Sequence, residues 1–461
     1  MCNALVRSTL LLVVTAMTGC RESLGRPRAA DTREFREPPV VVSRTGVLQV
    51  ALRAAVSSVD IGGQRVSMMT LNGQYIPPTL RARPGDTLRV TLTNAISEPT
   101  NLHTHGLAVS PAESSDNIFL RLAPGATQQY DIHLPIDHPP GLYWYHPHPH
   151  GFSEEQTRNG MSGALIVEGL LDSFPTLRDV PERLLLLKDI QVENGHVVRL
   201  HIGEKTIRTV NGVVRPVMVM RPGETQLWRI ANIGADLYYV LTLQGHRFQI
   251  VARDGFRRSK VTTADTLRLS PGARVEVLVT ASGPGQYVLR TGDVDTGRSG
   301  NQYVGTVMAT LRVEGPPAAP VVIPKTLLPV EDLRGKVTNH RTIVFSESTD
   351  GDTFFIDGKT FDMNRIDTHV KLGAIEEWTI RNSADELHTF HIHQGPFQLV
   401  EINGVPQPAD DHRDIVDIPI GGEVKVIIPF TNPLMVGRFV YHCHILSHED
   451  KGMMATIQVS P

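Results

Sequence analysis

The sequence predicts an all-β protein made of three β-sandwich domains. Its 461 residues correspond to about three domains of ~150 residues each. A set of turn-forming residues recurs three times along the chain, and short stretches of alternating apolar and polar residues follow each copy. Short alternating strands separated by Gly, Pro, Asn and Asp are typical of antiparallel sandwiches.

Each of the three copies carries the same succession of turns and strands. The first turn is Asn72-Gly73, Asn211-Gly212 or Asp357-Gly358. A glycine turn follows at Gly85, Gly223 or Gly373, and the alternating strand after it ends at Asn94, Asn232 or Asn382. A later strand begins with glycine, and these strands are 141–145, 285–288 and 437–441. The repeat therefore predicts three copies of one supersecondary unit.

We expect the three domains at residues 45–170, 171–317 and 325–461. The Pro-rich stretch from Pro316 to Pro329 is expected to link the second domain to the third. Residues 20–44 are rich in polar and charged residues and contain proline, which predicts a tether ahead of the first domain.

The N-terminal residues have the pattern of an export signal. Arg7 precedes an apolar stretch from Leu10 to Met17, and Thr18-Gly19-Cys20 follows. This resembles a bacterial lipoprotein signal over residues 1–19, with Cys20 as the lipid-bearing first residue of the mature chain. Because Met17 stands where Leu is usual, an ordinary cleaved signal peptide stays open. Both kinds of signal predict an exported, periplasmic protein, and a lipoprotein signal also predicts a lipid anchor to the cell envelope.

The composition argues against several classes of partner. The formal net charge is −3 and the pI is near 6.7, which favours neither nucleic acid nor an anionic membrane surface. No apolar stretch after the leader is long enough to span a bilayer, so membrane contact is expected only through the lipid on Cys20. Since Cys2 leaves with the leader, Cys443 stands alone and the mature fold is expected to have no disulfide.

Histidines gather in four short motifs, which hold ten of the 19 histidines. The motifs are His103-Thr104-His105, His146-Pro147-His148, His388-Thr389-Phe390-His391-Ile392-His393 and His442-Cys443-His444-Ile445-Leu446-Ser447-His448. One His-x-His pair is a weak signal, but four of them indicate a site for several copper ions, because neutral imidazole binds copper well. In the last motif, a thiol, a nearby His and the more distant Met453 are what a blue-copper site requires.

The position of these motifs in the repeat predicts where metal would bind. The first and third copies carry histidines at matching places, whereas the second copy has Leu237-Tyr238-Tyr239 and Leu289-Arg290 there. Four His-x-His pairs can therefore converge between the first and third domains, with the second as a spacer. Side chains at i and i+2 of a strand share a face, so His442 and His444 should face one centre while Cys443 faces another. Pro147 occupies the place of Cys443 in the first copy, so only the third can build a thiolate site.

Over residues 45–461 the chain resembles the multicopper oxidases, because all four of that family's copper motifs are present in the family's order. The resemblance implies that each domain is a cupredoxin-type Greek-key β-sandwich and that four copper ions bind. It implies a type 1 copper held by His388, Cys443 and His448, with Met453 as axial ligand. The type 2 copper would take His103 and His391. The type 3 pair would take His105, His146, His148, His393, His442 and His444, and His150 is not expected to bind.

The resemblance also implies an oxidase that couples four one-electron oxidations of a phenolic, aromatic or metal-ion substrate to the reduction of O₂ to water. Its partners would be O₂ and a small reductant, and we expect a monomer. Glu449 matches the family's acid near the type 3 site, and Asp116 its acid near the type 2 site; both are expected to deliver protons. Either could instead be a loop carboxylate that caps backbone amides. Asp414 is a weaker candidate for orienting a ligand histidine.

Two other functions stay open. Copper nitrite reductases also build cupredoxin domains, but they need two domains and a three-histidine site, and the four paired motifs argue against them. A copper-free scaffold of the cell envelope could share the fold, but such relatives lack ligands and none is missing here. The substrate is also open between phenols, aromatic amines, bilirubin, Cu(I), Fe(II) and Mn(II). The 12 methionines are dispersed, which disfavours a dedicated role in copper detoxification.

Overall fold

The computed structural model describes Met1 and residues 34–200 and 205–461. The expected leader over 1–19 and the expected lipid-bearing Cys20 lie outside the described residues, apart from Met1, and so does the tether as far as residue 33. The described residues from Glu34 onward belong to one unit.

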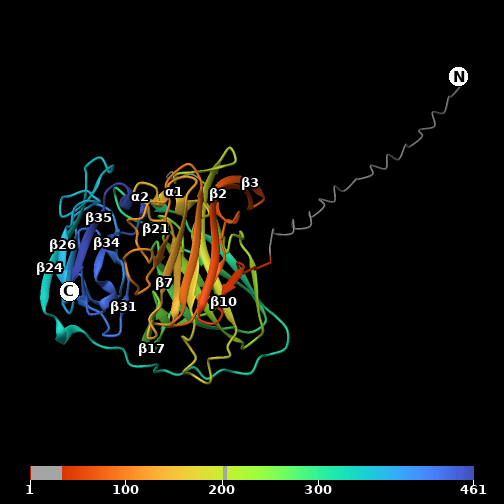
Figure 1. Ribbon diagram of the computed structural model, residues 1–461. Helices are drawn as coiled ribbons and strands as arrows, with labels where there is room; N and C mark the ends of the chain where they lie inside the picture. The colour runs from red at the N-terminus through yellow and green to blue at the C-terminus, as the bar shows by residue number, and fades with distance from the viewer. Residues whose placement is uncertain (2–33, 201–204) are drawn as a thin grey trace. The chain divides into compact units, whose positions relative to one another are not determined.

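Strands make up most of the structure, and each repeat contributes two sheets (Figure 1). One sheet of the first repeat has the order β1 (Val40–Val42), β4 (Thr79–Ala82), β9 (Gly163–Val167), β8 (Gly141–His146) and β6 (His103–His105). Its other strands are β3 (Gln64–Leu71), β2 (Val47–Ile61), β5 (Thr87–Ala95) and β7 (Thr127–His133).

The second repeat has one sheet with the order β17 (Phe256–Ala264), β16 (Phe248–Arg253), β19 (Arg274–Thr280), β14 (Thr225–Asn232), β10 (Glu182–Glu193) and β11 (His196–Val198), and β12 (Ile207–Val210) pairs with β10. Its other sheet has the order β13 (Val217–Met220), β23 (Thr306–Val313), β20 (Gly285–Thr291), β15 (Tyr239–Leu243) and β18 (Leu267–Leu269). A short pair, β21 (Val294–Asp295) and β22 (Gln302–Tyr303), lies apart from both.

The third repeat has one sheet with the order β25 (Phe354–Ile356), β24 (Asn339–Glu347), β27 (Ile375–Asn382), β33 (Glu423–Pro429), β29 (Phe397–Ile402) and β30 (Val405–Pro406), and β31 (His412–Arg413) pairs with β29. The other has the order β26 (Thr368–Lys371), β35 (Met454–Ser460), β34 (Gly437–Cys443), β28 (His388–Ile392) and β32 (Ile415–Ile418). The helices of the described residues are α1 (Ser153–Arg158), α2 (Leu446–Asp450) and the 3₁₀ turns η1 (Arg334–Lys336) and η2 (Pro433–Met435).

The same parallel pairings recur in all three repeats, which is the topological counterpart of the sequence repeat. In one sheet of each repeat the first long strand pairs in parallel with the strand after the glycine turn: β2 with β5, β10 with β14, and β24 with β27. In the facing sheet the pairs are β4 with β9, β13 with β23, and β26 with β35. Each repeat has its own buried apolar core. The predicted all-β class of three cupredoxin-type sandwiches is confirmed.

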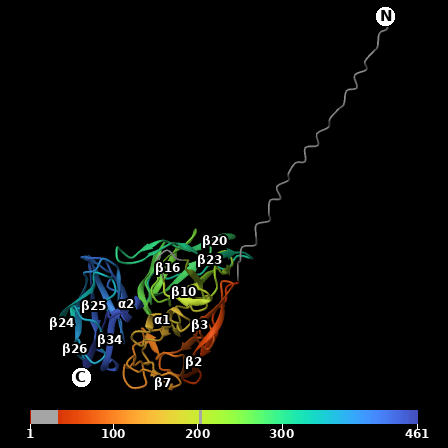
Figure 2. The same cartoon turned by 90° about the horizontal axis from the view of Figure 1, so that it is seen from above.

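The first two repeats share a sheet, which the sequence did not predict. The strand β11 forms a hairpin with β10 through Asn194-Gly195, and His196 then pairs with Ser67 of β3. This single pairing joins the strands of both repeats into one 11-stranded sheet. An apolar cluster around Trp144, Tyr75 and Leu186 fills the space between the two repeats. The two repeats therefore form one support, against which the third repeat packs (Figure 2).

The C-terminal part of the tether that we expected over residues 20–44 forms a strand in the structure. Val40–Val42 forms β1, which pairs in parallel with β4, and Val41 packs on the core of the first repeat. Three successive β-branched residues after Pro38-Pro39 favour a strand, and the edge of this sheet provides the partner. The amide of Phe35 also donates to the carbonyl of Val217 in the second repeat, so ordered pairing begins before residue 45.

In the described part of the chain, no helix combines the length and the apolar character that crossing a membrane would require.

Candidate metal centres

The histidine motifs lie at the ends of paired strands in the first and third repeats. In the first repeat, β6 pairs with β8 and places His103 opposite His146. In the third repeat, β28 pairs with β34 and places His391 opposite His442. Side chains of directly opposite residues in an antiparallel pair are adjacent, so each repeat presents one group of imidazoles.

The two groups meet across the interface between the first and third repeats. The ring of His103 stacks on that of His393, and the ring of His105 stacks on that of His391, each with 4.0 Å between centroids. Nε2 of His148 lies 3.3 Å from Nε2 of His442. None of these side chains is more than 1% exposed. We call this set the eight-histidine cluster: His103, His105, His146, His148, His391, His393, His442 and His444.

Several ring nitrogens of the cluster are oriented as ligands would be. Nε2 of His103, His146 and His391 is buried and has no hydrogen-bond partner among the described residues. The opposite nitrogens are held in place: Nδ1 of His146 lies 2.9 Å from the carbonyl of Pro147, and Nδ1 of His391 lies 2.7 Å from the carbonyl of Asp414. A carbonyl fixes the N–H on Nδ1 and leaves the lone pair of Nε2 pointing inward, as in metal-ligating histidines. Because a buried unpaired nitrogen costs ~1–3 kcal/mol, the donor set fits metal ions.

The electrostatics of the cluster support the same conclusion. Burial lowers the pKa of every one of these histidines, and for all of them except His442 neighbouring imidazoles lower it further. The pKa of His146 falls to about 3 and that of His442 to about 4. The rings are therefore neutral at pH 7, which is the protonation state that binds metal.

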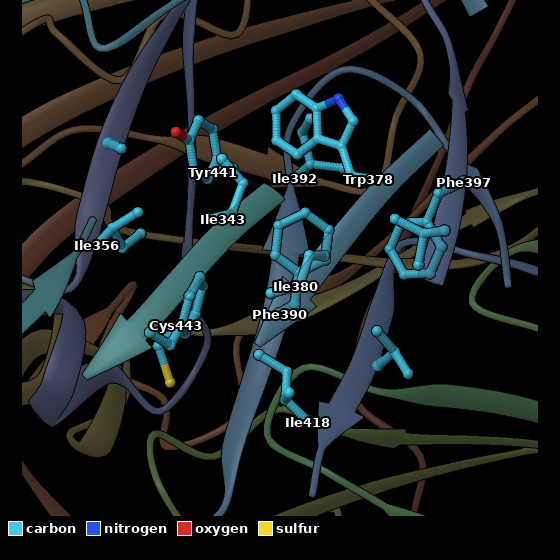
Figure 3. Close-up of a cluster of buried hydrophobic side chains, with 14 of the residues drawn as sticks. Ile343, Ile356, Trp378, Ile380, Phe390, Ile392, Phe397, Ile418, Tyr441 and Cys443 are labelled. Carbon is cyan, nitrogen blue, oxygen red and sulfur yellow. The ribbon is translucent and has the colours of Figure 1, made fainter. Parts of the chain in front are cut away.

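A second group of potential ligands contains the single described cysteine. Sγ of Cys443 lies 3.7 Å from Nδ1 of His388 and 3.8 Å from Nδ1 of His448, and these two nitrogens are 3.2 Å apart. We call this group the thiol site. Met453 is fully buried in the same core, and its carbonyl accepts from the amide of Cys443 at 3.0 Å. Figure 3 shows Cys443 among the apolar side chains of this core, next to Phe390.

One strand joins the two groups, as the alternation in the sequence predicts. His442 belongs to the eight-histidine cluster, whereas the next residue, Cys443, belongs to the thiol site. The strand β34 ends at Cys443, so His444 lies beyond it, yet Nε2 of His444 is 3.2 Å from Nδ1 of His105. Burial raises the pKa of the Cys443 thiol, so the thiolate would form only against a positive charge such as a metal ion.

Glu449 contacts the cluster directly. Its carboxylate oxygens lie 3.3 Å from Nδ1 of His148 and 3.3 Å from Nδ1 of His442. The hydroxyl of Ser153, from α1, donates to it at 2.8 Å, so α1 and α2 meet here. Burial raises the pKa of Glu449 well above its usual range. The Glu449 carboxylate therefore faces two histidines of the cluster.

Asp116 contacts a different histidine of the cluster, His103, and it also accepts from a backbone amide. Its oxygens are 3.0 and 3.1 Å from Nδ1 of His103. It also accepts from the amide of Thr104 at 2.8 Å and from the side-chain amide of Gln394 at 3.0 Å. Burial raises the pKa of Asp116 to about 7, against the hydrogen bonds that lower it. Asp116 therefore both caps a strand and orients His103.

The second repeat supplies no histidine to the cluster, but one of its arginines supports the cluster through Asp414. Arg274 of β19 is fully buried and binds Asp414 through two hydrogen bonds of 2.6 and 2.7 Å. Asp414 in turn lies 3.4 Å from Nε2 of His105 and accepts from His391 through its carbonyl. No spacing signal marks Arg274, because its role depends on a contact between repeats.

A second feature that the sequence did not reveal is a hollow beside the thiol site. It has a volume of about 210 Å³, and His448, Glu386, Asp236 and Lys451 are among its lining residues. Oε1 of Glu386 lies 3.2 Å from Nε2 of His448, so this carboxylate contacts the edge of the ring away from Nδ1, the nitrogen that faces Cys443. The hollow therefore lies directly beside a residue of the thiol site.

Fold and site together define a multicopper protein, and comparison with known families agrees. Family models described as multicopper oxidase match residues 54–171, 187–316 and 335–461. The chain belongs to the multicopper oxidase family.

Relatives with different names have similar sequence identity to this chain. The multicopper oxidase mco of Staphylococcus haemolyticus is 26% identical over 408 residues, which cover 84% of this chain and 83% of the relative. The cell division protein FtsP of Escherichia coli is 28% identical over 450 residues, which cover 92% of each chain. Among solved structures, a Campylobacter jejuni multicopper oxidase described as a metallo-oxidase is 26% identical, with a TM-score of 0.82 over 93% of this chain and 96% of its own.

Proposed function

We propose that this protein is an oxygen-reducing multicopper oxidase with four copper ions. The observation that carries the proposal is the complete set of buried, neutral histidines whose unpaired nitrogens converge next to the thiol site. In this proposal the type 1 copper binds His388, Cys443, His448 and, axially, Met453. The other three ions bind the eight-histidine cluster, with His103 and His391 on the type 2 ion. Bound copper would supply one-electron redox chemistry and the binding of O₂.

The chain's own contribution to electron transfer is a covalent path. Cys443 is bonded through the backbone to His442 on one side and to His444 on the other. Both histidines lie in the eight-histidine cluster, so a route of covalent bonds connects the thiol site with it. Because the Cys443 side chain is fully buried, water does not reach this route.

Protons would come from the two buried carboxyl groups. Reduction of one O₂ to two waters takes up four protons. Burial raises the pKa of Glu449 and so favours its protonated form, and its oxygens lie 3.3 Å from Nδ1 of two histidines of the cluster. Ser153 donates to Glu449. The next residue after Glu449, Asp450, accepts from three backbone amides of residues 151–154. These polar groups would lead from Glu449 toward the surface. Asp116 would serve the opposite side, since its pKa of about 7 allows both protonation states.

The hollow beside His448 supports a metal ion as the reductant. Its volume of about 210 Å³ is below the range of ~300–1,000 Å³ that pockets for larger organic ligands occupy. Three acidic side chains line it, from Glu154, Asp236 and Glu386, together with the basic Arg199 and Lys451. Burial raises the pKa of Glu386 to about 9, so this group would bind a metal ion by losing its proton. Carboxylates suit Fe(II) and Mn(II), whereas Cu(I) prefers sulfur, and the described lining contains no Met or Cys. We therefore place Fe(II) or Mn(II) ahead of Cu(I) and phenols.

The likeness to a relative named as a cell division protein supports a second candidate function, in which this chain is a copper-free scaffold. Copper analysis of the purified protein, combined with O₂ uptake on Fe(II), Mn(II), Cu(I) and a dimethoxyphenol, separates the two. The oxidase proposal expects four coppers per chain and O₂ uptake that is fastest with Fe(II) or Mn(II). A protein that binds no copper after reconstitution would support the scaffold.

A variant pair tests the reductant site. Glu386→Gln removes the carboxylate beside His448 and should raise KM for Fe(II) more than KM for the phenol. Asp352→Asn is the matched control, because Asp352 is exposed and pairs only with Lys451 at the rim of the hollow. Equal effects of Glu386→Gln on both substrates would remove the carboxylate from metal-ion recognition.

The remaining expectations from the sequence are proposals as well. We propose domains at 45–170, 171–317 and 325–461, and export to the periplasm with a lipid on Cys20 as a monomer. The three matched family segments support the domain division, since each lies largely within one proposed domain.

A further inference from the structure

A second hollow lies between the second and third repeats, away from the reductant hollow. Its volume is about 470 Å³. The second repeat contributes Arg253, Arg268 and Arg274 to its lining, and the third contributes Arg413 and Asp417. Four arginine residues thus line one cleft between two repeats, although the Arg274 side chain itself is fully buried.

Three of the four arginines already have a carboxylate partner. Arg274 binds Asp414, as described above. Arg413 binds both oxygens of Asp411, at 2.7 and 2.6 Å. Arg268 donates to Asp417 at 2.7 Å.

Arg253 is the arginine of this cleft that has no carboxylate partner among the described residues. Its side chain has no hydrogen bond or ion pair to any other residue in the described ranges, although it ends β16 at the cleft. Asp254, the next residue in the chain, lies 3.7 Å from the guanidinium of Arg274 and also accepts from the backbone amide of Arg274 at 2.8 Å. Burial, and then the charge of Arg413, lower the pKa of Arg253 to about 10, so the guanidinium remains charged at neutral pH. Arg253 is half-buried, and a charged side chain that is partly removed from water is stabilised by a counter-charge.

We propose that this cleft binds a small oxyanion of the phosphate or sulfate type, with Arg253 as its principal contact. The planar fork of a guanidinium matches the oxygens of such an anion and can donate two parallel hydrogen bonds. The other arginines of the lining add positive potential, and each lining acid has a guanidinium partner: Arg268 for Asp417 at 2.7 Å and Arg274 for Asp254 at 3.7 Å. The anion would lie between groups from two repeats and would therefore strengthen their contact. This proposal does not depend on the oxidase function.

Calorimetric titration of the copper-loaded full chain with inorganic phosphate or sulfate, at ionic strength held constant with chloride, tests the site. We expect one anion per chain and a rise in melting temperature that chloride does not produce. Arg253→Gln should weaken phosphate binding at least tenfold. Arg290→Gln is the matched control, since Arg290 is an exposed arginine of the same repeat outside the cleft.

A third variant keeps the test decisive if Arg253→Gln folds poorly. Arg253→Lys preserves the charge but loses the fork, and it should bind phosphate several-fold more weakly than the wild-type chain. Circular dichroism establishes that each variant is folded. Phosphate binding unchanged in Arg253→Gln or Arg253→Lys, or no stabilisation of the wild-type protein beyond that by chloride, would overturn the proposal.

Discussion

Arg274 holds the three repeats together, and its removal should be among the most damaging single changes in the chain. Its guanidinium donates to the carbonyl of Leu142 in the first repeat at 3.2 Å and to that of Asp254 in the second at 2.8 Å. It also forms the paired hydrogen bonds with Asp414 of the third repeat. Neither Arg274 nor Asp414 is more than 1% exposed, so solvent screens this interaction little.

We predict that Arg274→Met lowers the free energy of unfolding by ~3–5 kcal/mol, because it leaves the Asp414 carboxylate buried without a partner. The loss should be measured by equilibrium denaturation in urea. The double variant Arg274→Met/Asp414→Leu should recover part of it, since no charge is then buried alone. Arg247→Met is the control: Arg247 and its partner Asp265 are both exposed, and such pairs contribute ~0–1 kcal/mol. A loss below ~1 kcal/mol for Arg274→Met would refute this reasoning.

Three further predictions concern the metal centres and a buried lysine. Met453→Leu should raise the type 1 reduction potential in a redox titration, because a thioether donor is lost; an unchanged potential would mean that Met453 only packs. Glu449→Gln should lower kcat by about 10²-fold while copper content and the rate of electron entry from substrate stay the same, and wild-type turnover across the pH range would exclude Glu449 from proton delivery. Burial lowers the pKa of Lys188 to about 7, so between pH 7 and ~10.4 the unfolded chain binds more protons than the folded one and stability should rise with pH. Urea denaturation of Lys188→Met at pH 7 and 9 should lack that rise, and an equal rise in the variant would argue against the shift.

The features that could be predicted from the sequence are those determined by residues close together in the chain. The turns at Gly85, Gly223 and Gly373 and the alternating strands after them depend on nearby residues, so the three sandwiches could be predicted. The four histidine motifs are equally local, since each pair comes from one strand end. Their convergence followed from the repeat, because equivalent strands in the first and third copies carry them.

The features that the sequence did not reveal depend on contacts between distant residues. The pairing of His196 with Ser67 is a single contact between two repeats, and no local sequence pattern predicts it. Arg274 and Glu386 look like ordinary strand or loop residues, and only the packing of the repeats brings them to His105, through Asp414, and to His448. β1 was missed for a related reason, since three valines form a strand only where a sheet edge is available.

The central claim is that the buried histidines and Cys443 hold copper that reduces O₂. The most direct measurement is the copper content, visible absorption and O₂ uptake of the reconstituted chain beside those of Cys443→Ser. We predict four coppers and a blue thiolate-to-copper band in the wild-type protein, with the band and the O₂ uptake both lost in Cys443→Ser. A Cys443→Ser protein that kept its blue band, or a wild-type protein that bound copper but consumed no O₂ with any reductant, would contradict the account.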